Sequence, residues 1–108
     1  MNRDQFLEHD KKLSEQAHAL MERKNDDYAN SEYAFANFKH SEIAGVPMEL
    51  GVIVRMSDKM SRIANLIKKG GEGSVKEESM RDNIMDLKNY AGILDGILVD
   101  KEMLEELK

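Results

Sequence analysis

The segment Glu78-Ser-Met-Arg-Asp82-Asn-Ile-Met-Asp86-Leu-Lys-Asn-Tyr90 gives the clearest indication of the fold. Glu78, Asp82 and Asp86 recur every four residues, and on a helix this spacing places three carboxylates in one column. Like charges one turn apart weaken a helix unless a cation or a basic partner neutralises them. Two interpretations are open: a half-buried acidic site for a divalent cation or a basic partner, and a solvated stripe with local salt bridges, for instance to Arg81.

The spacing of apolar residues predicts an all-α fold. The expected helices are Arg3–Lys24, Pro47–Lys69, Val75–Leu98 and a short C-terminal helix, Lys101–Lys108, capped by Asp100. Asn2 and Gln5 form a capping box at the start of the first helix, and Pro47 suits the first position of the second. A short glycine turn makes the second and third helices antiparallel neighbours.

The apolar stripes predict which residues form the core. In the second helix the stripe is Val52, Met56, Met60, Ile63 and Ile67, and in the third it is Met80, Ile84, Leu87, Ala91, Leu94 and Leu98. Further apolar residues lie outside these stripes: Leu50, Ile53, Val54, Ile93 and Ile97. A monomer would expose this surplus, so we expect a homo-oligomer, either a dimer or a dimer of dimers, with the ligand site beside the subunit contact.

Composition narrows the class of protein. The chain has 108 residues, enough for one domain, and a net charge of −5, which argues against direct DNA binding. It has no cysteine, which fits a reducing cytoplasm. The N-terminus is too polar for a signal peptide, and no apolar run approaches the ~20 residues of a membrane span.

The connection between the first two helices, residues 24–45, carries four of the six aromatic residues. The rings of Tyr28, Phe35 and Phe38 either pin this connection to the core or form a pocket wall in which one ring stacks on a base.

The second helix has a charged face with Arg55, Asp58, Lys59 and Arg62. It is either an exposed salt-bridge ladder or a site in which Asp58 faces the acidic column and the cations contact phosphates.

Four segments together resemble a known family. They are Lys24-Asn25-Asp26-Asp27-Tyr28, Phe35-Ala36-Asn37-Phe38, Arg55-Met56-Ser57-Asp58-Lys59-Met60-Ser61-Arg62 and Glu78 through Tyr90. In order and spacing, over roughly residues 20–98, they resemble the helical nucleotide-modification-associated domain of phages and prophages. That family looks like a relative of the MazG-like all-α NTP pyrophosphatases, which bind Mg²⁺ through helix-borne acidic residues and cleave NTP to NMP and pyrophosphate. The usual Glu-x-x-Glu and Glu-x-x-Asp pairs differ here, because Asp58 stands alone and Glu78 and Asp82 are four residues apart.

The resemblance implies a cytoplasmic phage protein with an antiparallel MazG-like bundle completed by oligomerisation. It further implies nucleotide binding and Mg²⁺-dependent NTP pyrophosphohydrolase activity, with Asp58, Glu78 and Asp82 as the catalytic metal ligands. The ligand-binding residues would be Lys24, Asp27, Tyr28, Asn37, Phe38, Arg55, Lys59, Arg62, Asp86, Asn89 and Tyr90. Two alternatives are open: a non-catalytic protein that sequesters a nucleotide signal or cofactor (an anti-defence sponge), and a structural oligomerisation module.

Overall fold

The computed structural model describes residues 1–26, 32–70 and 74–108, with side chains for all of these except residues 26 and 74–78. Its elements are α1 (Arg3–Asp26), the 3-10 helix η1 (Ala36–Lys39), α2 (His40–Ile43), α3 (Met48–Lys68) and α4 (Ser74–Asp100). No strand occurs in these described ranges, so the all-α prediction is confirmed. Within the same ranges, no helix is long and apolar enough to cross a membrane.

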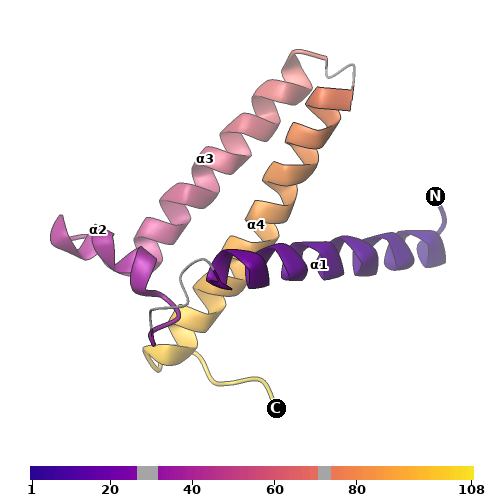
Figure 1. Ribbon diagram of the computed structural model, residues 1–108. Coiled ribbons are helices and arrows are strands. Elements are labelled where there is room, and N and C mark those ends of the chain that lie inside the picture. The colour runs from indigo at the N-terminus through magenta and orange to yellow at the C-terminus, as the bar shows by residue number, and fades with distance from the viewer. Residues whose placement is uncertain (27–31, 71–73) are drawn as a thin grey trace.

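α4 makes the most extensive helix–helix packing of the fold, with α3 and with α1. α3 and α4 run side by side as an antiparallel hairpin, as the sequence predicted, and η1 and α2 lie at the N-terminal end of α3 (Figure 1). α1 crosses α4, and its N-terminal half projects away from the hairpin (Figure 1). The expected capping box is present: the Asn2 N–H donates to Gln5 Oε1, and the Gln5 N–H donates to Asn2 Oδ1, each at 2.9 Å.

The core lies at the end of the hairpin where α3 begins and α4 ends. Met48, Val52 and Ile97 are buried there. Partly buried side chains pack around them: Tyr33, Phe35, Phe38, Met56, Tyr90, Ile93 and Leu94. Phe35 and Phe38 therefore pin the aromatic connection to the core.

The predicted core stripes are wrong in part. Met60 and Ile67 were expected inside but are 60% and 63% exposed, and Ala91 is also exposed. Ile97 was expected at the surface but is fully buried, and Ile93 is partly buried. The reason is the rotation of α4 about its own axis. The side of α4 with Tyr90 and Ile97 faces α3, and the predicted apolar stripe lies beside it.

Two predicted helix ends are corrected. Pro47 precedes α3 with an extended backbone (φ −55°, ψ 143°) and accepts hydrogen bonds from the N–H groups of Leu50 and Gly51, so it is not the first helical residue. The C-terminal helix predicted for residues 101–108 is absent: α4 continues through Asp100 and then ends in a reversal.

A Schellman turn makes this reversal. The Met103 N–H donates to the Leu98 carbonyl at 2.8 Å, and the Glu102 N–H donates to the Val99 carbonyl at 3.0 Å. Lys101 donates to Glu49 of α3 at 2.7 Å, which lowers the pKa of Glu49 and raises that of Lys101. Since Glu49 is near the start of α3, a longer α4 would project past its neighbour with little to pack on.

Glu102 occupies the left-handed position of this turn with φ 60°. A non-glycine residue is strained there by roughly 1–2 kcal/mol. Glu102→Gly is therefore expected to raise the free energy of unfolding by about 1 kcal/mol, measured by urea titration. Glu105→Gly lies beyond the turn and serves as the control, with no comparable gain; equal effects of the two substitutions would contradict the turn assignment.

Candidate functional site

Three helices converge on the carboxylate of Asp86 in α4. Lys59 of α3 donates to its Oδ2 at 2.9 Å, and Lys24 of α1 donates to its Oδ1 at 3.3 Å. The Asp86 and Lys59 side chains are only 16% and 18% exposed, whereas Lys24 is 56% exposed. Asp86 thus anchors two ammonium groups, of which Lys24 remains accessible to a ligand.

An aromatic pair lies one helical turn away from this ion pair. Arg55 precedes Lys59 by one turn of α3, and Tyr90 follows Asp86 by one turn of α4, so the antiparallel hairpin brings them to the same level. The Arg55 guanidinium lies 4.7 Å from the centroid of the Phe38 ring. The Phe38 and Tyr90 rings meet edge to face with centroids 6.4 Å apart. The site therefore combines cations with aromatic surface.

The structure brings together six of the predicted ligand-binding residues, namely Lys24, Phe38, Arg55, Lys59, Asp86 and Tyr90. Asn37 is half-buried in η1, next to Phe38 in sequence. Asn89 is buried, and its side-chain amide donates to the Ala17 carbonyl of α1 at 2.9 Å, which makes it a link between helices. Asp27 and Tyr28 lie outside the described residues.

The expected metal ligands do not form a group among the described side chains. Asp58 and Asp82 are both exposed, and Glu78 belongs to α4 but its side chain lies outside the described part. Within that part, no three His or carboxylate residues come close enough to hold a metal ion. Asp86 is already neutralised by two lysines. The described donor set does not fit Mg²⁺.

The paired groups of this site carry more positive than negative charge. Lys24, Arg55 and Lys59 carry three positive charges, and Asp86, which pairs with both lysines, carries one negative charge. Asp58, next to Lys59 in α3, and Asp82, one turn before Asp86 in α4, are exposed and reduce this local excess of cations. Arg62 lies exposed further along α3 and could add to the positive field.

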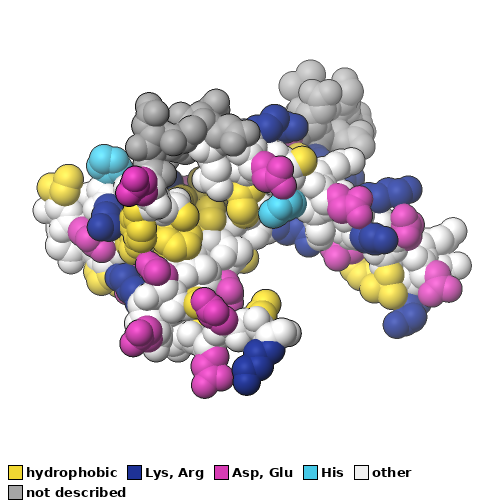
Figure 2. Space-filling model, turned by 60° about the horizontal axis from the view of Figure 1, so that its bottom comes forward, with side chains coloured by type: hydrophobic (Ala, Val, Ile, Leu, Met, Phe, Trp, Pro, Cys, Tyr) yellow, Lys and Arg dark blue, Asp and Glu magenta, His cyan; other side chains and the backbone are white. Residues whose placement is uncertain are grey.

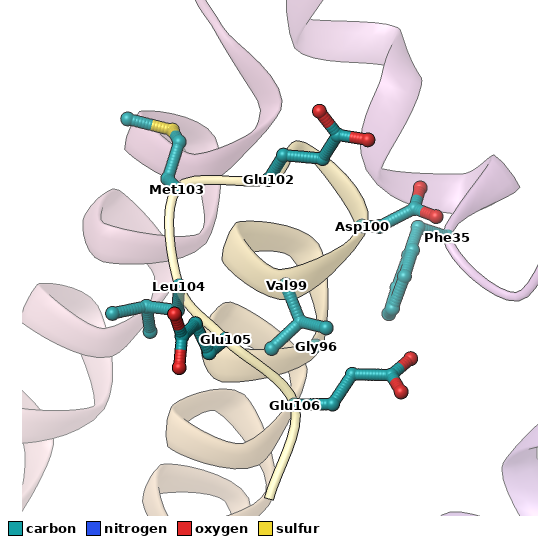
Figure 3. Close-up of a pocket in the computed structure, with 9 residues that line it drawn as sticks. All are labelled: Phe35, Gly96, Val99, Asp100, Glu102, Met103, Leu104, Glu105 and Glu106. Carbon is teal, nitrogen blue, oxygen red and sulfur yellow. The ribbon is translucent and has the colours of Figure 1, made fainter.

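A cavity of about 690 Å³ lies elsewhere, under the chain that follows α4. Its lining includes Phe35, Val99 and Leu104 as well as four carboxylates. Figure 2 shows hydrophobic side chains exposed near the end of α4 with acidic side chains around them, and in Figure 3 Met103 points away from Phe35. The lining contains none of the predicted site residues, and its carboxylates would repel phosphate.

Comparisons with known proteins identify no relative: no family model, no curated protein and no solved structure matches this chain.

Proposed function

We propose that the chain binds a nucleotide or a nucleotide-derived ligand at the site formed by Lys24, Lys59, Arg55, Phe38 and Tyr90. The observation that supports this is the placement of three cations and two aromatic rings within one turn of an antiparallel hairpin. Ammonium and guanidinium groups bind phosphate oxygens, and aromatic and guanidinium planes stack on bases.

The ion pair suggests how the phosphates bind. A phosphate oxygen would take the place of Asp86 as the acceptor for Lys24, whose side chain is 56% exposed. Lys59 is held by Asp86 in a fixed position and would act as a preorganised second donor. The base would stack on Arg55, which covers one face of Phe38.

Binding can be tested by calorimetry with common NTPs and dNTPs. Lys24→Ala and Lys59→Ala are each expected to weaken binding by about 10-fold or more, since a hydrogen bond to a charged group contributes about 1.5–3 kcal/mol. Lys12→Ala is the matched control on α1, because Lys12 is exposed and precedes Lys24 by about three turns of that helix. Equal losses in all three variants, or no binding by the parent protein, would contradict the proposal.

Adding Mg²⁺ to the same experiment distinguishes a hydrolase from a protein that only sequesters the nucleotide. Pyrophosphate release that is lost in a folded Asp82→Ala variant would show the hydrolase implied by the resemblance. Tight binding without turnover would favour a sequestering protein. We favour binding without hydrolysis, because Asp58 and Asp82 do not gather with a third metal ligand among the described side chains.

A further inference from the structure

The outer flank of α3 carries an exposed apolar seam. Ile53, Met60 and Ile67 follow one another at intervals of seven residues and are 47%, 60% and 63% exposed. The residues three positions before them complete a heptad pattern. We call the whole set the α3 seam: Leu50, Ile53, Ser57, Met60, Ala64 and Ile67. All six are exposed in the single chain.

α4 carries a second apolar row that the single chain buries only in part. We call it the α4 stripe: Met80, Ile84, Leu87, Ala91, Leu94 and Leu98. Five of these residues are half-buried and Ala91 is exposed. This row has the spacing of a core-facing helix surface, yet none of its members is fully buried.

The α3 seam and the α4 stripe lie on the same face of the hairpin. In α3 the seam is rotated by roughly a quarter turn from Val52 and Met56, which face α4. In α4 the stripe is rotated by roughly a quarter turn, in the same sense, from Ile97, which faces α3. Because the helices are antiparallel, these rotations point to one side. α1 contacts other positions of α4, at Asn89, Lys88 and Arg81, whereas the residues of the α3 seam are all exposed.

The chain exposes more surface area than a compact monomer of its mass. The accessible surface is 8252 Å², whereas a compact monomer of 12.3 kDa would expose about 6,100 Å². The radius of gyration is 15.9 Å, against about 13 Å for a compact chain of this length. The surplus of roughly 2,100 Å² per chain is about 4,200 Å² for two copies, which lies within the ~2,000–5,000 Å² that obligate homodimer interfaces bury in total.

The α3 seam is complementary to itself when reversed. In an antiparallel pair of α3 helices centred between Asp58 and Lys59, Ser57 faces Met60 of the other copy and Ile53 faces Ala64. Each small residue thus meets a large one. Leu50 meets Ile67 at the two ends.

The α4 stripe is also complementary to itself when two α4 helices pair in antiparallel orientation about Asn89. There Leu87 faces Ala91, Ile84 faces Leu94, and Met80 faces Leu98 of the other copy. The two centres lie at the same level. Lys59 contacts Asp86, and Glu49 contacts Lys101, so the middle of α3 lies level with residues 86–91 of α4. One two-fold axis therefore serves both helices.

We infer that two copies of this chain pair through the α3 seam and the α4 stripe, about a two-fold axis perpendicular to the helices, to form an antiparallel four-helix bundle. This places the subunit contact on the face away from Lys24 and α1, whereas the sequence alone suggested a contact beside the ligand site. The inference does not depend on the proposed function.

The mass in solution tests the pairing. Light scattering at micromolar concentration should give twice 12.3 kDa for the parent chain and a mass close to one chain for Met60→Glu, with the helical circular dichroism signal kept. Ile43→Glu is the control, because Ile43 is 87% exposed in α2, outside this face. A monomeric parent chain, or a dimeric Met60→Glu variant, would overturn the inference.

Cross-linking tests the register, since the natural chain contains no cysteine. Ile53→Cys and Ala64→Cys chains refolded together should form a disulfide-linked heterodimer, and neither variant alone should cross-link to itself. A dimer in which the mixture fails to cross-link, or in which one variant alone does so, would overturn the antiparallel α3 pairing.

Discussion

Ile97→Ala is expected to lower the free energy of unfolding by about 2–5 kcal/mol. Ile97 is 0% exposed and forms the buried cluster with Met48 and Val52, which joins α4 to the start of α3. Truncation removes buried methyl groups and leaves a cavity that the two neighbouring helices cannot close without moving. Urea unfolding at fixed protein concentration measures the effect, because an association of chains would make stability depend on concentration.

Ile43→Ala is the matched control for this prediction. Ile43 is 87% exposed, so its truncation should change the free energy of unfolding by no more than about 0.5 kcal/mol. If the two substitutions cost the same, the core is not where the structure places it.

Ile97 also shows what the sequence could and could not predict about the fold. The helices were predictable because periodicity and caps, such as the Asn2–Gln5 box, are local properties. α4 has two apolar rows, one with Ile97 and one with Met80 and Leu98, and both have helical spacing. Which row faces α3 depends on how the neighbouring helices pack, and the periodicity of one helix carries no information about that.

The end of α4 was mispredicted for a similar reason. Residues 101–108 have good helical propensity and contain no glycine or proline. The turn at Glu102 is set by where α3 begins, and the Lys101–Glu49 contact marks that level. Local propensity therefore favoured a helix that tertiary structure does not support.

The sequence indicated several residues of the candidate site but not which of them form ion pairs. Four-residue spacing left two interpretations open, and the structure shows Asp86 half-buried against two lysines while Asp82 is exposed. The spacing could not distinguish a metal ion from lysines, because the partners Lys24 and Lys59 are far from Asp86 in sequence. Asn89 was expected to bind the ligand, but its position one turn from Asp86 also faces α1, where its side-chain amide donates to the Ala17 carbonyl.

Asn89→Asp is expected to detach α1 from the hairpin. The Asn89 amide is buried and donates to the Ala17 carbonyl at 2.9 Å. A carboxylate in its place would put a buried negative charge against a carbonyl oxygen, and an unpaired buried charge costs about 3–5 kcal/mol. Amide hydrogen exchange should therefore accelerate along α1 around Ala17, and nucleotide binding should weaken because Lys24 is carried by the same helix.

Acid should reverse this effect. Burial without a donor raises the pKa of the new carboxyl above the ~3.9 of an exposed aspartate. The deficit in stability relative to the parent chain should be full above that raised pKa and should shrink as the pH falls, because the protonated carboxyl can donate to Ala17. Asn65→Asp, at an exposed position on α3, is the control and should leave α1 protected at every pH. A deficit for Asn89→Asp that stayed constant from neutral to acid pH would show that the buried charge is not its cause.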